Sequence, residues 1–339
     1  MRIEIKDSVS EEVYSECRTF PNFNLYHSKA WHLMLRDAFG WRVRAVMACG
    51  QSGEIVGYLP FVSKRRFGRI INVALPLSHR VGVITRSGDA EIVGALCRSV
   101  EPLELHAATD GAASVKSGLL ETVADLSDVK DSEDFRPFLG KGIRRDLKDA
   151  GKAGICVRSS DNASDFAIFR KLQTETRRRQ GAPDYPSQFF PAIQEHLASA
   201  GLARVHLSEL NGIPVAGVVS LSDPDKSTLY YGYGASVTDK KILKMRVNQA
   251  ALWDALAFAI ESGANRFSFG STPVNQDALW KYKERFGGKS TPIEWATYGA
   301  ATSSISTEGL AARIGAHVLR TLPVPVFRAI SPLLLKEVV

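Results

Sequence analysis

Three strand-like segments in a row, followed by an apolar helix, constrain the fold of this chain more than any other feature. The segments lie between residues 203 and 235 and read ARVHLSEL, IPVAGVVSLS and STLYYGYGA. Asn211 and Gly212 separate the first two, and this pair is a strong signal for a tight hairpin. Residues 244–262 then have helical spacing and are apolar almost all round, which is typical of a helix buried against a sheet. The sequence therefore predicts an antiparallel meander covered by a helix.

The first half of the chain also combines strand-like runs with helix candidates, although no sequence repeat between the two halves is readable. A helix candidate, HSKAWHLMLRDAFG, has Ser28 as its expected cap, and four strand-like runs follow it. The length of 339 residues favours two domains. We expect an α+β fold with two units, each a mostly antiparallel central sheet flanked by helices. The weakly patterned segment 111–137 is the expected link between them.

Charge and cysteine use narrow the class of protein. The net charge of +7 favours anionic partners such as nucleic acid, phosphorylated metabolites or an acidic membrane surface, without choosing among them. The four cysteines are far apart, and the histidines lack metal-ligand spacing, so we expect reduced thiols and no metal site. The N-terminus lacks the apolar core of a secretory signal, and no apolar run is long enough to span a bilayer. These features predict a cytoplasmic protein.

The tyrosine-rich end of the third strand is the first candidate site. Strand alternation puts Tyr231 and Tyr233 on one face, and Gly232 and Gly234 would allow a ligand or another backbone to approach. The phenols could bind a sugar or phosphate oxygen, or the strand could simply pack on a helix.

Basic residues gather just before the apolar helix, where cations are unfavourable unless an anion is bound. They are a candidate phosphate site or a solvated loop, and comprise Lys240, Lys241, Lys244 and Arg246. Residues 235–262 contain no glycine, which excludes a Walker-type loop here. A second basic group could grip phosphates or form a solvated face; it joins Lys141, Arg144, Arg145 and Lys148 to Arg177, Arg178 and Arg179.

The segment FSFGSTPVNQDALWKYKERFGG supplies the last candidate. We expect a strand ending at Gly270, then a helix capped by Ser271 or Thr272 with Lys283 on its last turn. Lys283 could complement the helix dipole, or it could stabilise an oxyanion at the end of the sheet. No G-x-S-x-G elbow marks a covalent nucleophile, which favours direct transfer.

The order and spacing of six segments resemble the FemABX aminoacyl transferases of the GNAT superfamily. The segments are HSKAWHLMLRDAFGW, EIVGYLPFVSKRRFG, KGIRRDLKDAGKAGICV, FRKLQTETRRRQGAPDYPSQFF, GIPVAGVVSLSDPDKSTLYYGYGAS and FSFGSTPVNQDALWKYKERFGG. The resemblance implies tandem GNAT-like domains. Residues 1–135 would form the first, on the acceptor side and joined by a C-terminal helix at 305–339, and residues 136–304 would form the second, with the transferase cleft.

The resemblance also implies roles for single residues. Lys283 would correspond to the family's catalytic cation. Arg177 and Tyr231 or Tyr233 would bind the acceptor, and Lys29 and Trp31 lie where the family's first domain contacts the precursor. Lys244 and Arg246 stand where ordinary GNAT enzymes have a glycine-containing loop for acyl-CoA, which makes an ordinary acetyl-CoA mode doubtful.

These implications predict an enzyme that moves an aminoacyl group from aminoacyl-tRNA to an amine of a peptidoglycan-type precursor, with no tightly bound cofactor. The acceptor would be an anionic glycan or a nucleotide- or lipid-linked precursor. An alternative is acyl-CoA-dependent N-acylation of an amino sugar in exopolysaccharide synthesis, and another is a non-catalytic scaffold that binds glycan or membrane. The apolar tail TLPVPVFRAISPLLLKEVV is a candidate contact with the cytoplasmic face of the inner membrane.

Overall fold

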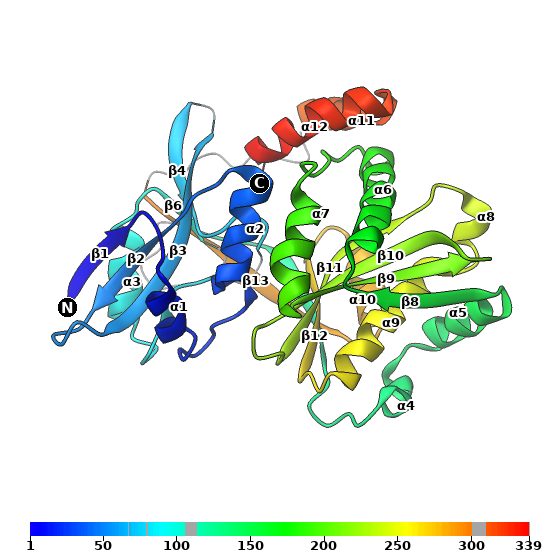
Figure 1. Cartoon of the computed structure of the whole chain (residues 1–339), viewed down its shortest axis with the longest axis horizontal. Coiled ribbons are helices and arrows are strands. Elements are labelled where there is room, and N and C mark those ends of the chain that lie inside the picture. Colours follow the sequence, from blue (N-terminus) through cyan, green and yellow to red (C-terminus); the bar gives the residue numbers. More distant parts are fainter. Residues whose placement is uncertain (67, 79–80, 106–113, 300–309, 339) are drawn as a thin grey trace. The chain divides into compact units, whose positions relative to one another are not determined.

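The computed structural model describes residues 1–66, 68–78, 81–105, 114–299 and 310–338 (Figure 1). The chain forms two compact units, one mainly from Met1–Leu119 and the other mainly from Leu120–Thr291. Strands β7 (Ser114–Asp125) and β13 (Lys289–Tyr298) each contribute to both. The expected α+β class is confirmed.

The first unit has a mostly antiparallel sheet in the order β1-β2-β3-β4-β6-β13, with β5 paired to β3. Only the β4–β6 pair is parallel among the registers described for this unit. Helix α2 begins after Ser28, whose hydroxyl accepts the N–H of Trp31 at 3.3 Å as expected for a cap. The elements are β1 (Arg2–Lys6), α1 (Glu11–Cys17), α2 (Lys29–Phe39), β2 (Val43–Cys49), β3 (Ile55–Arg66), β4 (Arg69–Val73), β5 (Ile84–Thr85), α3 (Ala90–Arg98) and β6 (Leu103–Leu105).

The second unit holds the predicted meander. Its strands run in the order β7-β12-β11-β10-β9-β8, and the pairs from β8 to β11 are antiparallel. Asn211 and Gly212 both have positive φ between β9 and β10, as the hairpin signal predicts. The strands are β8 (Ile155–Ser160), β9 (Ala203–Leu210), β10 (Ile213–Ser222), β11 (Thr228–Ser236) and β12 (Arg266–Pro273).

Helices cover both faces of this second sheet. Gly217 of β10 lies against Phe169 of α6, whereas its neighbour Val218 belongs to the core around α9, so α6 and α9 lie on opposite faces. The small residues Ala251, Ala255 and Ala259 of α9 are fully buried, which confirms the predicted buried helix. The helices are α4 (Ser132–Phe135), α5 (Lys141–Lys152), α6 (Ala163–Gln180), α7 (Phe189–Ala192), α8 (Lys240–Leu243), α9 (Val247–Glu261), α10 (Asp277–Glu284), α11 (Leu310–Thr321) and α12 (Val324–Val338).

The expected domain boundaries differ from the structure in two respects. The expected link 111–137 contains strand β7, and the change of unit falls between Leu119 and Leu120 rather than at 135. The C-terminal helices group with the second unit instead of joining the first. Arg178 Nε donates to the Leu322 carbonyl at 2.9 Å, and the Asp184 N–H donates to Ser331 Oγ at 2.8 Å. Such long-range bonds leave no local sequence pattern, so the sequence alone does not show which unit the tail joins.

Candidate functional site

A β-bulge in β11 decides where the tyrosines point. Val219 pairs with Tyr233 and the adjacent Ser220 pairs with Tyr231, so Gly232 is an extra residue on β11. Cross-strand partners share a face, and Val219 and Ser220 lie on opposite faces. Tyr231 and Tyr233 therefore lie on opposite faces, and the expectation that they share one is wrong. Strict alternation fails because the bulge shifts the register by one residue.

Tyr233 packs into an aromatic cluster. Its ring meets Tyr185, Phe189 and Phe190 edge-on at centroid distances of 5.3–5.6 Å. The residue is only 9% exposed. This ring is part of the core on the α7 side, so its position does not favour direct substrate binding.

Tyr231 instead lies on the α9 face of the sheet and lines a cavity of about 330 Å³ that residues of both α6 and α9 border. A Cβ on Gly234 would lie 1.8 Å from the Tyr231 hydroxyl, so the ring reaches along the strand only because residue 234 is glycine. Tyr282 and Gln249 line the same cavity. Burial raises the pKa of Tyr231 to about 12 and raises that of Tyr282 as well. Both phenols are therefore protonated at neutral pH and can donate hydrogen bonds.

A polar network between α6 and the end of β11 borders the same cavity. Thr176 Oγ1 accepts the Ser236 N–H at 2.9 Å and donates to the Ser236 carbonyl at 3.0 Å. Arg179 donates to the Val237 carbonyl at 2.6 Å and to Ser236 Oγ at 3.2 Å. These partners of Arg179 are neutral oxygens, so its charge remains available to an anion. The sequence placed Arg179 only within a basic run and did not single it out.

Lys283 lies on the last turn of α10, but its surroundings differ from those expected. Strand β12 continues through Pro273 and α10 begins at Asp277, so neither Ser271 nor Thr272 caps the helix. The ammonium donates to Thr272 Oγ1 at 2.6 Å and to the carbonyls of Ser271 and Gly270 at 3.2 and 3.3 Å. The strand end is thus tied to α10 through the three donors of one lysine.

The protonation of Lys283 is set by its burial. The residue is 6% exposed, and loss of solvation lowers its pKa to about 8, while the charge of Glu121 acts in the opposite direction. Glu121 is itself buried and accepts the Ser268 hydroxyl at 2.7 Å. Lys283 is therefore mostly a cation at neutral pH.

The other residues expected to bind substrate are divided between the two units: Arg177 is in the second unit, and Lys29 and Trp31 are in the first. Arg177 donates to the Pro183 carbonyl at 2.7 Å and stacks over Tyr185, which holds its guanidinium in place. Lys29 is on the surface of the first unit and pairs with Glu11. Trp31 is fully buried against Tyr26 in that unit, so its position speaks against direct contact with a substrate.

Two of the expected phosphate contacts lie at the start of α9. Lys244 is exposed. Arg246 has φ +66° at the N-cap and pairs with Asp146 at 3.1 Å. A non-glycine residue in this left-handed conformation is uncommon. Asp146 also accepts Gln249 Nε2 at 3.4 Å, so it fixes two residues at this helix start.

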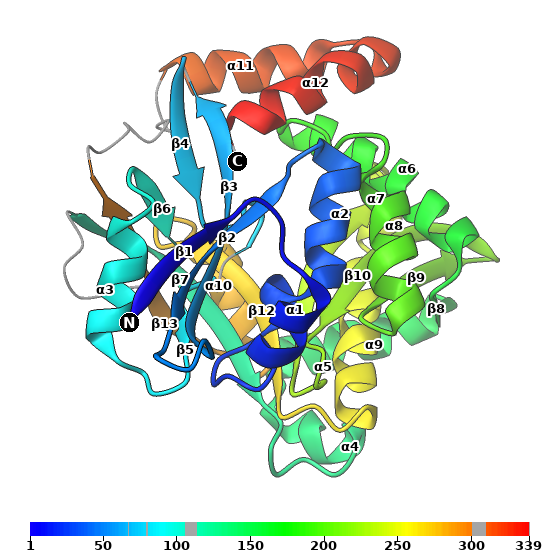
Figure 2. The ribbon, with the colours of Figure 1, turned by 60° about the vertical axis from the view of Figure 1, so that its left-hand side comes forward.

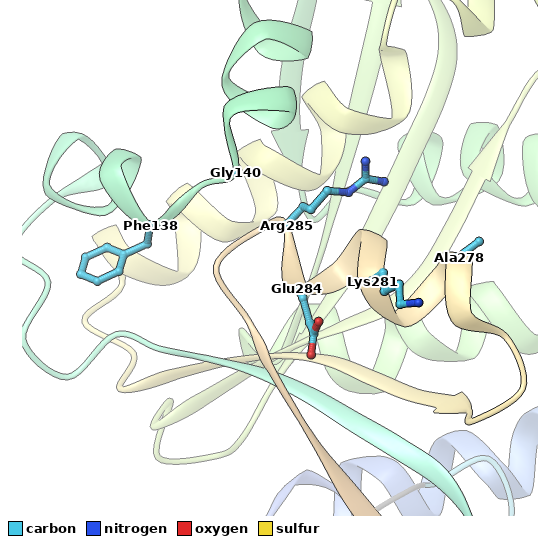
Figure 3. A pocket seen from close by; sticks show the side chains of 6 residues that line it. All are labelled: Phe138, Gly140, Ala278, Lys281, Glu284 and Arg285. Carbon is cyan, nitrogen blue, oxygen red and sulfur yellow. The ribbon is translucent and has the colours of Figure 1, made fainter.

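A second hollow, of about 650 Å³, lies on the surface beside α10 (Figure 3). It is lined by Phe138, Gly140, Ala278, Lys281, Glu284 and Arg285. Figure 3 shows the Phe138, Glu284 and Arg285 side chains pointing in different directions, so they do not converge on one ligand position.

A chain of hydrogen bonds joins the half-buried Asp254 to the buried His206 and Ser220. Asp254 Oδ2 and Ser220 Oγ each lie 2.8 Å from a ring nitrogen of His206. His206 is fully buried and Ser220 is 2% exposed, so no substrate reaches the serine, and the arrangement is structural. Burial lowers the pKa of His206, which keeps the ring neutral. Sequence inspection missed this chain because its members lie on three separate elements.

Comparisons with known proteins concern the fold of the chain. Residues 139–284 match the family model described as an acetyltransferase (GNAT) domain. None of the curated proteins matches the chain in sequence. The solved structure of FemX has a TM-score of 0.67 at 16% identity, over 87% of this chain and 96% of FemX.

Two further solved structures share the fold. L-PGS from Bacillus licheniformis has a TM-score of 0.57 at 13% identity, over 96% of this chain and 98% of that one. A tandem GNAT protein from the clavulanic acid biosynthesis pathway has a TM-score of 0.52 at 11% identity, over 89% and 100%.

The fold and the domain match define an enzyme of the acyltransferase class, built from tandem GNAT-like domains. Within that class the chain has a FemABX-like fold, with the GNAT domain itself at residues 139–284.

Proposed function

We propose that this chain transfers an aminoacyl group from aminoacyl-tRNA to an amine of a peptidoglycan-type precursor of the cell envelope. The FemX-like fold supports aminoacyl transfer. So does the likeness to a C-terminal domain named as a putative lysylphosphatidylglycerol synthetase from Agrobacterium fabrum, because that product joins an amino acid to a lipid.

The observation that carries the choice of donor is the turn before α9. The N–H groups of residues 243–246 donate within the turn, to the carbonyls of Asp239, Lys240, Ile242 and Leu243 at 2.9–3.2 Å. The Lys241 N–H donates to Asp239 Oδ1 at 2.7 Å. A backbone cradle for a pyrophosphate needs outward N–H groups. Of the six N–H groups of residues 241–246, five are engaged in this way, and only that of Ile242 is not. This favours aminoacyl-tRNA over acyl-CoA.

The reaction we propose is direct aminolysis of the ester. The acceptor nitrogen forms a bond to the ester carbonyl carbon, the bond from that carbon to the ribose oxygen breaks, and the proton lost by the amine ends on the ribose hydroxyl. Tyr231 donates a hydrogen bond to the developing oxyanion or the leaving oxygen. Lys283 supplies positive charge from the neighbouring strand end, and Arg179 binds a phosphate at the cavity wall.

The test supplies the purified chain with tRNA charged with labelled amino acids and a nucleotide-linked muropeptide that carries a free amine. A parallel reaction supplies acetyl-CoA and an amino sugar. We expect transfer from charged tRNA only, and a loss of about 10²-fold in Tyr231→Phe, the magnitude typical of losing one oxyanion donor.

Tyr233→Phe is the matched control, because it removes a phenol from the same strand on the opposite face. Its rate should stay close to that of the unchanged chain. Transfer from acetyl-CoA alone would overturn the donor in favour of amino-sugar acylation, and failure of both reactions in a folded chain would favour a binding scaffold.

A further inference from the structure

The C-terminal helices carry an unusual share of exposed apolar side chains. Thirteen large apolar residues are exposed in the described part of the chain, and six of them lie on α11 and α12. Their exposed fractions range from 39% to 65%. The six are Ile314, Val318, Val326, Ile330, Leu333 and Leu334.

The spacing of these residues forms one stripe on each helix. Ile314 and Val318 are four residues apart on α11, and the four members on α12 follow the spacing i, i+4, i+7, i+8. A separate stripe of α12 faces the protein, because Phe327, Ser331 and Leu335 are buried at successive spacings of four. One stripe of α12 therefore packs against the protein, whereas the stripe of exposed apolar residues faces outward and does not fill the core.

Hydrogen bonds between the C-terminal helices and the second unit fix which side of these helices faces outward. Beyond the bonds from Arg178 to Leu322 and from Asp184 to Ser331, Arg320 donates to the Gln180 carbonyl at 3.1 Å. Gly181 lies so near α11 that a Cβ there would be 2.4 Å from the Ala316 carbonyl oxygen. Figures 1 and 2 show α11 and α12 side by side along this edge of the unit.

The charges on the same segment favour an anionic surface. Residues 310–338 contain Arg313, Arg320, Arg328 and Lys336 but only one acid, Glu337. Cationic amphipathic helices of this kind lie in the headgroup region, with apolar side chains inserted and cations near anionic lipids. None of the helices in the described ranges is long and apolar enough to cross a bilayer. We propose that α11 and α12 dock this enzyme onto the surface of an anionic membrane.

The test is flotation of the full chain with vesicles of phosphatidylglycerol and phosphatidylcholine, and with vesicles of phosphatidylcholine alone. We expect binding to the anionic vesicles, and weakening as salt rises from 50 to about 500 mM, where the screening length becomes short. Ile330→Ser with Leu333→Ser should weaken binding about tenfold or more for each side chain. Arg328→Gln should weaken it about fivefold.

Ile213→Ser is the matched control, because Ile213 is 66% exposed, like Leu333 at 65%, but lies in the β9–β10 hairpin. It should bind as the unchanged chain does. Absence of binding to anionic vesicles at low salt overturns the proposal, and so does binding that Ile330→Ser with Leu333→Ser leaves intact. A dimer in light scattering that this double variant dissociates, without vesicle binding, would assign the surface to a second copy instead. None of these outcomes depends on the acyl donor.

Discussion

Replacement of Lys283 by Met should change how the stability of the protein depends on pH. The pKa of this lysine is about 8 in the folded chain against 10.5 in solvent, because burial disfavours its charged form. Between these values the unfolded chain binds more protons than the folded one, so the free energy of unfolding rises with pH. A shift of this size corresponds to about 3 kcal/mol in the free energy of unfolding. The folded chain lacks this stabilisation at neutral pH and gains it by about pH 11.

Lys283→Met has no such titration, whereas all other groups titrate in both proteins. The unfolding free energy of the unchanged chain, minus that of the variant, should therefore increase by about 3 kcal/mol between pH 7 and pH 11. Urea titrations followed by tryptophan fluorescence at pH 7, 9 and 11 measure this difference. At pH 7 the variant also loses the donors to Gly270, Ser271 and Thr272, so only the change with pH isolates the burial cost.

Lys281→Met is the control, because Lys281 lies on the same helix with its side chain 57% exposed and pairs with Asp277. Its effect on the unfolding free energy at pH 7 should be small, because exposed ion pairs contribute little to stability. A difference for Lys283→Met that does not change with pH would refute the reasoning, since the ammonium would then be held in the folded chain without a cost.

Two further substitutions test how the site is supported. Gly181→Ala should destabilise the second unit by roughly 1–2 kcal/mol or more, because residue 181 has φ +69° and a Cβ there would clash with α11. Urea unfolding measures this change, and a neutral effect would contradict the close approach of Gly181 to α11. His206→Ala should cost roughly 2–4 kcal/mol, since it leaves a cavity and removes the partner of buried Ser220; a loss of transfer activity without loss of stability would show that the hydrogen-bond chain is not merely structural.

Local patterns predicted the scaffold of the second unit well. The Asn211-Gly212 pair, the apolar helix and the Ser28 cap each depend on neighbours within a few residues, and the structure has all three. The sequence predicts too early a start for the helix after β12, because Ser271 and Thr272 are good caps in isolation. The strand continues through them because Lys283 binds their oxygens from twelve and eleven residues away.

The candidate site was harder to predict because it depends on a register shift. Gly232 and Gly234 signalled a special backbone, yet only the pairing with Val219 and Ser220 shows that Gly232 is the extra residue. One inserted residue moves every later side chain to the other face. The glycines thus have two different functions: the first makes the bulge, and the second leaves room for the Tyr231 ring.

The same geometry connects the two residues that the sequence singled out for chemistry. Lys283 donates to the Gly270 carbonyl, and Gly270, at φ +71°, lies beside the Tyr231 backbone, with a Cβ position 3.8 Å from the Tyr231 carbonyl oxygen. The lysine therefore stabilises the part of β12 that adjoins the bulge, whereas the Tyr231 hydroxyl reaches into the cavity. In the reaction that we propose, the phenol is the group that contacts the substrate, and the buried ammonium acts through its charge and through the position of the strand.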